Sequence, residues 1–302
     1  MSILVVGSVA LDSLETPFGK VTDVVGGSAV HFSASASLFA PVQVVGVVGD
    51  DFPSEKLAFL KEREVDLSGV ETVSGESFRW SGRYTHDLSS PETLETRLGV
   101  FADFHPRIPP AFQSPELLFL GNIDPRLQLE VLEQVGDAGL VTCDTMNYWI
   151  DGSRNEFMEL LGRVDVLMAN DGEIRQLTGK TDLVTASRWV QERGPSHVVV
   201  KKGEHGAVLF HDEEIFFVPG YPLKDLNDPT GAGDSFAGGF LGFLHAAGDF
   251  SAESLRCALV FGSALGSFAV EDFGVSRLAR LGREEVAHRV REFRQMTQFE
   301  IN

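Results

Sequence analysis

The stretch that decides the fold runs from Asn227 to Phe240 and reads NDPTGAGDSFAGGF. A turn dipeptide and two closely spaced glycines lead into an acid, and a helical pattern of apolar residues follows at Phe236, Phe240, Phe243 and Ala247. Glycine has no Cβ and tolerates positive φ, so we expect Gly231 and Gly233 to leave the first amides of a helix open. Open amides and the positive end of the helix dipole attract an anion.

Asp234 follows this loop directly. A carboxylate beside a bound anion is repelled by it, which favours a catalytic base over a simple helix cap. The alternative is an ordinary glycine-rich loop with Asp234 as an N-terminal helix residue. The stretch is neither of the two common phosphate loops, because it has no GK[ST] lysine and its glycines do not fit GxGxxG.

The same stretch resembles, almost letter for letter, the C-terminal signature of the ribokinase/PfkB family of carbohydrate and nucleoside kinases. The resemblance implies that the backbone of Gly231, Ala232 and Gly233 stabilises a transferring phosphoryl group, with Thr230 beside the nucleotide. It implies that Asp234 removes the proton from the substrate hydroxyl. The implied cofactors are ATP and Mg²⁺, with K⁺ as a further candidate.

The charge of the chain limits its partners. The 302 residues include 25 basic and 44 acidic side chains, which gives a net charge of −19. We therefore expect neither nucleic acid nor an anionic membrane as a partner, although solubility or adaptation to salt explains the charge equally well. Long-range repulsion of ATP also means that a local positive group or a cation must hold the phosphates.

Two cysteines, Cys143 and Cys257, are too few for a disulfide framework. Both lie in apolar runs, so we expect buried free thiols and a cytoplasmic protein. The N-terminus enters an apolar strand pattern without a signal peptide, and no apolar run is long enough to span a membrane.

Short apolar runs predict buried strands at Ile3–Val6, Val42–Val48, Leu117–Leu120, Leu140–Cys143, Val164–Ala169 and His197–Lys201. Helical segments separate most of them: Ser28–Ala40, a helix that begins at Asp124-Pro125 and one with a capping box from Ser153 to Glu156. This alternation predicts an α/β fold, a doubly wound and mostly parallel sheet with helices on both faces. We expect one domain over residues 1–302.

Polar residues follow the end of each predicted strand. They are Gly7-Ser8, Gly49-Asp50-Asp51, Gly121-Asn122, Asp144, Asn170 and Lys202-Gly203. Ligands of open α/β sheets bind beyond the carboxyl ends of the strands, so these residues predict one shared site without reference to any family.

Two polar and aromatic segments, about 12–25 and 76–104, interrupt the alternation. The family resemblance implies that they form a small β lid, which in relatives often makes a dimer interface; a plain hairpin packed on the core is the alternative. Three arginines in these segments either bind a phosphosugar or are solvated lid charges, and we favour the second: Arg79, Arg83 and Arg97.

On the substrate side, Gly26 and Gly27 resemble the family's first signature, where a glycine pair lets the backbone approach the sugar. Asp12 matches the acid that binds substrate hydroxyls, as a carboxylate can accept two of them; an acid in a surface turn is the alternative. His31 stands where many relatives have an asparagine that contacts the sugar, and a core histidine explains it equally well.

On the nucleotide side, Asn170 and Glu173 match the Asn-x-x-Glu motif that orders Mg²⁺ and phosphates largely through water, and a capping arrangement is the alternative. The loop with Lys202, Gly203 and Gly206 resembles the family's turn under the nucleotide. At most one of its two lysines faces ATP, because successive strand residues point to opposite sides; a hairpin with exposed lysines is the alternative.

Three further segments are open to two readings. Asp228 matches a monovalent-cation position, or is part of an Asp-Pro turn. Asp144 to Asn147 departs from the spacing of relatives by one residue, so Asn147 receives no role. The small residues Ser263–Phe268 allow either adenine or another helix to approach closely.

Together these observations predict an ATP-dependent kinase of a small sugar or polyol. The alternatives are a nucleoside kinase, with Phe101, Phe104 and Trp80 stacked on a base or packed in the lid, a non-catalytic sensor on this fold and a Rossmann dehydrogenase. The acceptor, the preferred phosphoryl donor, the need for K⁺ and the oligomeric state do not follow from the sequence.

Overall fold

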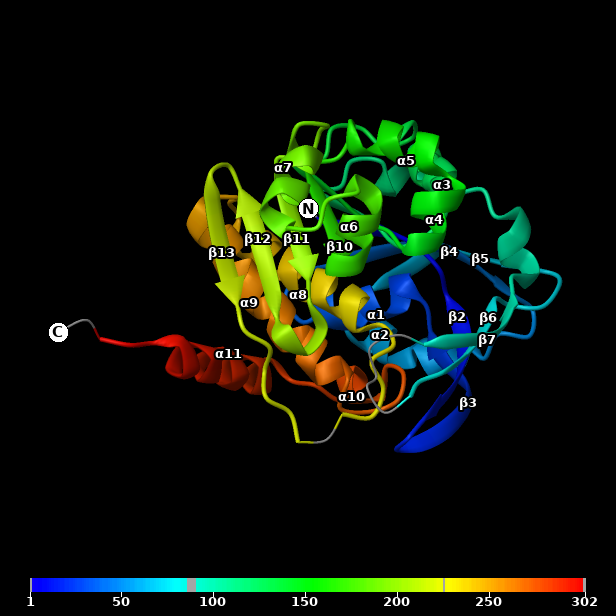
Figure 1. The fold of residues 1–302 in the computed structure, drawn as a ribbon. Coiled ribbons are helices and arrows are strands. Elements are labelled where there is room, and N and C mark those ends of the chain that lie inside the picture. The colour runs from blue at the N-terminus through cyan, green and yellow to red at the C-terminus, as the bar shows by residue number, and fades with distance from the viewer. Residues whose placement is uncertain (1, 86–90, 225, 301–302) are drawn as a thin grey trace.

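The computed structural model describes residues 2–85, 91–224 and 226–300. Within them, nine strands form one large sheet in the order β13-β12-β11-β10-β9-β8-β1-β4-β5 (Figure 1). These strands are β1 (Ile3–Val6), β4 (Val42–Gly49), β5 (Asp66–Val73), β8 (Leu117–Leu120), β9 (Leu140–Asp144), β10 (Val166–Asn170), β11 (His197–Lys201), β12 (Ala207–His211) and β13 (Glu214–Val218). Neighbours from β11 to β5 pair parallel, and β12 and β13 add an antiparallel hairpin at one edge.

The predicted doubly wound, mostly parallel sheet is therefore confirmed. All six predicted strands are present, although β10 begins at Val166 rather than Val164. The predicted strands did not include β5, β12 or β13. β5 is polar and largely exposed, whereas β12 and residues 215–218 of β13 are apolar runs that the prediction missed. The chain leaves β1 for β4 on one side and returns at β8 on the other, so the order switches between β1 and β8.

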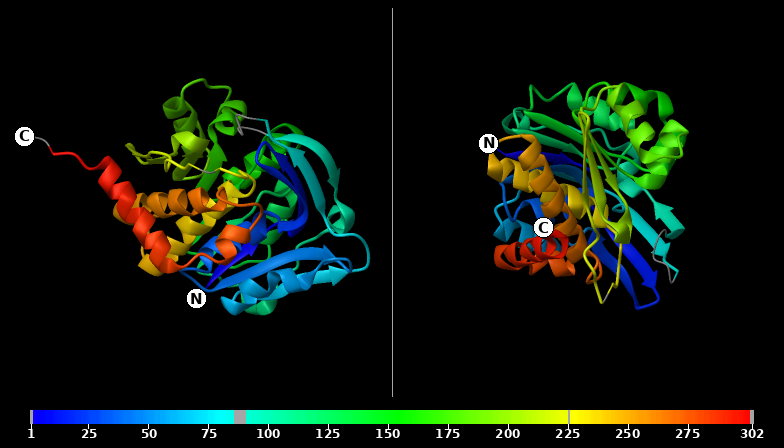
Figure 2. Two further views of the ribbon diagram at one scale, coloured as in Figure 1. Left: turned by 90° about the horizontal axis from the view of Figure 1, so that it is seen from below. Right: turned by 60° about the vertical axis from the view of Figure 1, so that its left-hand side comes forward.

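Helices cover both faces of the sheet (Figure 2). One face carries α1 (Ser28–Ala36), α8 (Ala232–Ala247) and α9 (Ala252–Ala269), packed on side chains such as Val5, Phe119 and Met168. The other face carries α3 (Pro125–Leu132), α5 (Arg154–Leu161), α6 (Asp171–Thr178) and α7 (Leu183–Gln191), packed on Leu4, Leu118 and Leu167. The remaining helices are α2 (Ala58–Glu62), α4 (Asn147–Gly152), α10 (Ser276–Ala279) and α11 (Arg283–Thr297).

A second sheet of four strands lies beside the large one, in the order β3-β2-β6-β7. Its strands are β2 (Ala10–Thr16), β3 (Gly19–Gly26), β6 (Arg79–Arg83) and β7 (Glu92–Arg97). They come from the two segments that interrupt the alternation, and β2 pairs parallel with β6 although the two are far apart in sequence. Every residue of β7 is exposed.

Three details differ from the sequence analysis. The side chain of Ser153 makes no capping hydrogen bond, because Ser153 also ends α4, and its amide donates to Trp149 O. Cys143 is buried, but Cys257 is exposed on the outer side of α9. The helix after Gly27 ends at Ala36 instead of reaching Ala40.

No helix in the described residues is both long and apolar enough to cross a membrane.

Candidate active site

The carboxyl ends of β9, β10 and β11 meet the N-terminus of α8 on one face of the sheet. Asp144 ends β9, Asn170 ends β10 and Lys201 ends β11. Asp144 and Lys201 contact each other directly, and the charges of both act on Asp234 in the first turn of α8. The ends of these three predicted strands therefore lie together at α8.

The loop before α8 is shaped by its first glycine. Gly231 has a φ of 73°, in the left-handed region that favours glycine, and a Cβ there would lie 2.3 Å from the ring of His31. Gly233, by contrast, lies within α8, so a left-handed backbone conformation does not explain why a glycine stands there. Of the three amides expected to hold a phosphoryl group, that of Ala232 donates to Pro229 O at 3.2 Å.

Asp234 lies half-buried in the first turn of α8. Burial, and then the charge of Asp144, raises its pKa to about 7, while Lys201 and the backbone amide of Asp234 itself act in the opposite direction. A carboxylate with a pKa near neutrality suits a general base, which must both accept and release a proton at physiological pH.

The buried lysine of this site is Lys201. Its Nζ donates to Asp144 Oδ2 at 2.6 Å, and a Cβ on Gly233 would lie 2.9 Å from Nζ. Burial opposes the charge of Lys201, yet Asp144 and Glu173 raise its pKa. Gly233 thus makes room for an ammonium group at the helix N-terminus.

Lys202, the lysine that sequence analysis assigned to the nucleotide, lies elsewhere. Its Nζ is 5.9 Å from the ring centroid of Phe217, on the edge strand β13. Lys201 follows the same alternation as Val199, which packs on the α8 side of the sheet, and Lys202 comes after the strand has ended. The geometry therefore favours Lys201 as the lysine that faces the site.

The acid of the second sheet, Asp12 on β2, lies against the glycine pair. A Cβ on Gly26 would come within 1.9 Å of Asp12 Oδ2, so the carboxylate occupies the space that Gly26 leaves. Gly27 has a φ of 94° and caps α1, and its amide hydrogen-bonds to Asp12. Burial raises the pKa of Asp12 to about 7, with further contributions from Asp228 and Asp234.

His31 is buried on α1 between these groups, with 1% of its surface exposed. Within the described residues neither ring nitrogen has a hydrogen-bond partner, and burial lowers its pKa to about 4. A buried imidazole normally has at least one partner. The unpaired nitrogens fit a histidine that contacts substrate better than one that only packs in the core.

Asn170 and Glu173 form a capping box at the start of α6. Glu173 N donates to Asn170 Oδ1 at 2.8 Å, and Asn170 N donates to Glu173 Oε2 at 2.7 Å. Burial raises the pKa of Glu173 to about 7, Lys201 opposes this and Asp144 adds to it. The capping alternative is thus realised, and a carboxylate that is costly to ionise also remains beside the site.

The turn after β11 includes Gly203 and Gly206, both at positive φ. A Cβ on Gly206 would clash with Val218 O at 2.0 Å, so this glycine is required by packing against the end of β13. A Cβ on Gly203 would meet nothing within 4 Å, so Gly203 faces open space where a ligand has access.

Asp228 is fully buried and holds two loops together. Its Oδ1 accepts Thr230 N at 2.9 Å, and its Oδ2 accepts Gly274 N at 3.0 Å. Thr230 Oγ1 in turn lies 3.1 Å from the hydroxyl of Tyr84, which follows β6. Tyr84 was not among the predicted site residues, and its only signal was its place in the polar and aromatic segment 76–104.

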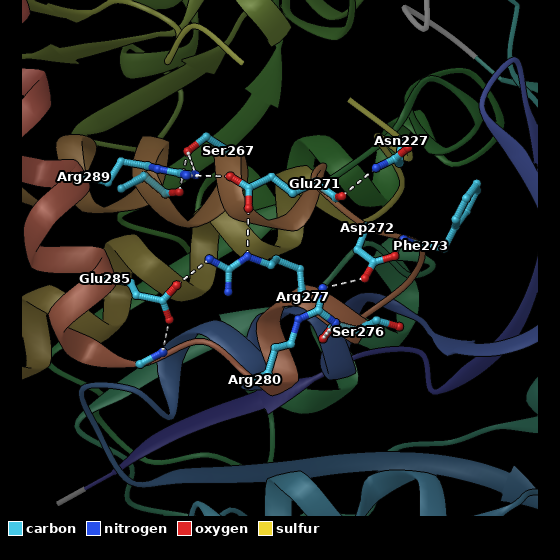
Figure 3. Close-up of polar contacts among 12 residues, drawn as sticks. Asn227, Ser267, Glu271, Asp272, Phe273, Ser276, Arg277, Arg280, Glu285 and Arg289 are labelled. Atoms are coloured by element: carbon cyan, nitrogen blue, oxygen red, sulfur yellow. Dashed lines mark hydrogen bonds and ion pairs between the residues drawn. The ribbon is translucent and has the colours of Figure 1, made fainter. Parts of the chain in front are cut away.

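A polar network holds the loop that leads into α8 (Figure 3). Asn227 Nδ2 donates to Glu271 O at 2.7 Å, and Asn227 N donates to Val270 O at 2.8 Å. The carboxylate of Glu271 accepts from Arg277 at 2.8 Å and from Arg289 at 2.5 Å. Residues just after α9, together with arginines from α10 and α11, thereby fix the loop that leads into α8.

Other candidates lie away from the site. The three arginines of the second sheet form ion pairs: Arg79 with Asp51, Arg83 with Glu15 and Arg97 with Glu76 and Glu95. This matches solvated or structural charges better than a phosphosugar site.

The aromatic candidates for base stacking pack within the second sheet and its connections. Phe101 stacks on Phe78 and on Phe104, and Trp80 Nε1 donates to Thr93 Oγ1 at 3.3 Å. These contacts match the lid-packing alternative.

A doubly wound sheet with carboxylates, a lysine and a helix N-terminus gathered at one edge is an arrangement suited to a small-molecule kinase. Residues 3–280 match the pfkB family of carbohydrate kinases, and the chain belongs to this family. It is accordingly a phosphotransferase of the carbohydrate and nucleoside kinases, with an alcohol group as acceptor.

A curated relative agrees with this assignment, and solved structures share the fold. The chain is 32% identical to a cytidine kinase of Thermococcus kodakarensis, over 80% of this chain and 87% of the relative. Its fold is similar to that of a nucleoside kinase from Burkholderia thailandensis in complex with inosine, with a TM-score of 0.78, 19% identity and coverage of 96% and 98%. It is equally similar to a putative ribokinase II from E. coli in complex with ATP and Mg²⁺, with a TM-score of 0.78, 18% identity and coverage of 96% and 99%.

Proposed function

We propose that this protein transfers the γ-phosphoryl group of ATP to a hydroxyl on the ribose of a nucleoside. The observation that supports this reaction is the position of Asp234, a carboxylate with a pKa of about 7 at the N-terminus of α8, where no side chain caps the helix. The cytidine kinase relative, at 32% identity, supports a nucleoside as the acceptor. A free sugar or polyol remains the second candidate, supported by the family match.

In this mechanism Asp12 and the backbone at Gly26 and Gly27 bind hydroxyls of the acceptor. The unpaired nitrogens of His31 offer a further hydrogen bond to it. Asp234 takes the hydroxyl proton as the oxygen attacks phosphorus. The amides of Gly231, Ala232 and Gly233 then stabilise the charge on the phosphoryl group, a kind of interaction that typically contributes several kcal/mol to catalysis.

The residues at β10 suit a magnesium ion held mostly through water. Mg²⁺ needs few direct protein ligands and prefers oxygen, and Glu173 supplies a half-buried carboxylate next to Asn170. When bound, the ion would neutralise charge on the phosphates. The nucleotide would lie over Gly203 and Thr230, and Gly206 and Lys202 would shape or flank that turn.

The proposed function also includes a site for K⁺ and a homodimer surface. Asp228, fully buried and bonded to both neighbouring loops, is the proposed group beside a monovalent cation. The second sheet is the proposed lid over the acceptor, and its exposed strand β7, with Leu94 44% exposed, is the proposed surface for a homodimer.

The experiment is ATP consumption with Mg²⁺ and K⁺ across nucleosides, free sugars and inositols, run beside Asp234→Asn. We expect turnover with a nucleoside, cytidine foremost, and a loss of at least about 10²-fold in kcat in the variant because the base is gone. ATP binding, measured by calorimetry, should persist in the variant. Near-wild-type turnover by Asp234→Asn would refute the base, and turnover of free sugars alone would refute the nucleoside.

A further inference from the structure

Lys201 is a buried cation for which the mechanism above gives no task. Its side chain is largely enclosed, with 16% exposed, and its partner Asp144 is 5% exposed. The pair spans the end of β10, because β10 lies between β9 and β11 in the sheet. A buried ion pair is often no more stabilising than apolar residues of similar size, so stability alone is a weak explanation for it.

The position of the ammonium points to a ligand. Nζ lies where a Cβ of Gly233 would be in close contact, so it sits directly at the N-terminus of α8 and beside the proposed base. Around it are the carboxylates Asp144, Glu173 and Asp234, each of which interacts with its charge. Three acids and one lysine give the protein groups of the site a net negative charge, although its proposed substrate is a polyphosphate.

We propose that Lys201 contacts the transferring phosphoryl group, and that Asp144 positions the ammonium for this contact. An ammonium has three N–H donors, so it can bond to a phosphoryl oxygen while it keeps Asp144. A bond forms between the acceptor oxygen and the γ-phosphorus, the bond from that phosphorus to the bridging oxygen of ADP breaks, and the hydroxyl proton passes to Asp234. Lys201 remains protonated throughout. This role rests on the proposed kinase function.

A substitution at Gly233 tests the position of the Lys201 ammonium most directly. Gly233→Ala retains the backbone amide and the helical conformation, but its methyl group would displace the flexible end of Lys201. We therefore expect Gly233→Ala to fold normally and to lose kcat. If only the amides of the loop stabilised the phosphoryl group, Gly233→Ala would keep its kcat, because the variant retains its amide.

The main test compares Lys201→Met, Asp144→Asn and the double variant, with the exposed Lys180→Met as the matched control. We expect Lys201→Met to lose about 10²-fold or more in kcat, as when one preorganised donor to a transition state is removed. Asp144→Asn should lose less, with the KM of the acceptor unchanged, because the ammonium stays but is less well held. Lys180→Met should behave as wild type.

The double variant separates catalysis from structure. It removes both charges and so leaves no unpaired ion in the interior. If Lys201 touches the phosphoryl group, the double variant folds and stays as slow as Lys201→Met. A double variant within about threefold of wild-type kcat would overturn the role of Lys201 while leaving the kinase assignment intact. A wild-type protein inactive on every acceptor would overturn the proposed function, and this role with it.

Discussion

At the scale of single residues, the site is held in an unfavourable state of charge. Asp12, Glu173 and Asp234 all have pKa values raised to about 7, each primarily by burial. A carboxylate whose pKa is higher in the folded than in the unfolded protein costs stability whenever it is ionised. The proposed function accounts for this cost, because in it these carboxylates bind hydroxyls, accept a proton and hold a cation.

Asp12→Asn should therefore make the protein more stable and less active. The folded pKa of Asp12 is about 7 and its ordinary value is 3.8, so stability is lost as the pH rises through about 7 and is retained below about 4. We expect the variant to melt a few degrees above wild type at pH 8 and to show no gain at pH 4. The acceptor should bind more weakly to it.

Thermal denaturation at the two pH values, with the exposed Asp137→Asn as control, measures this effect. A variant that melts below wild type at pH 8 would show that Asp12 is stabilised in a way that its burial does not suggest.

At the scale of elements, the site depends on how closely α1 approaches α8. A Cβ on Gly238 of α8 would lie 2.3 Å from Phe32 O on α1, and one on Gly242 would lie 3.2 Å from Ala36. These two helices carry His31 and Asp234 respectively, so their separation sets the distance between these two side chains. The small residues of α8 therefore position the candidate site as well as allowing close packing.

Gly238→Ala should force the two helices apart. Overpacking of this kind typically costs about 1–3 kcal/mol, which corresponds to several degrees in Tm. Gly152→Ala is the matched control, because a Cβ at Gly152 would meet nothing within 4 Å and its φ is not positive. We expect the control to be neutral or slightly stabilising. Equal melting of the two variants would contradict the close helix contact.

At the scale of the whole molecule, the net charge of −19 favours expansion through self-repulsion. Screening by added salt should weaken this self-repulsion. We expect Tm to rise as tetramethylammonium chloride increases from about 0.1 M to about 1 M, over which the Debye length falls from about 10 Å to about 3 Å. The rise should vanish near the isoelectric point, where little net charge remains. A Tm that falls with salt would mean that the local ion pairs outweigh the overall repulsion.

The sequence by itself determined the class of fold, the six central strands and the presence of a helix that begins in the glycine-rich stretch before Asp234. These are local properties, since apolar runs, glycine spacing and helical periodicity are written in neighbouring residues. The edge strand β5 was missed because it is largely exposed and has no continuous apolar run. The capping box at Ser153 was wrong because two helices share that residue.

Only the tertiary structure decided which side chains meet. It brought Lys201 rather than Lys202 to the loop, since the side of the sheet that a strand residue faces depends on the register of the whole sheet. It joined Tyr84 to Thr230 across 146 positions of sequence, and it left both nitrogens of His31 without a partner among the residues that the structure describes. The raised pKa values have the same origin, because burial and the proximity of distant acids exist only after the chain has folded.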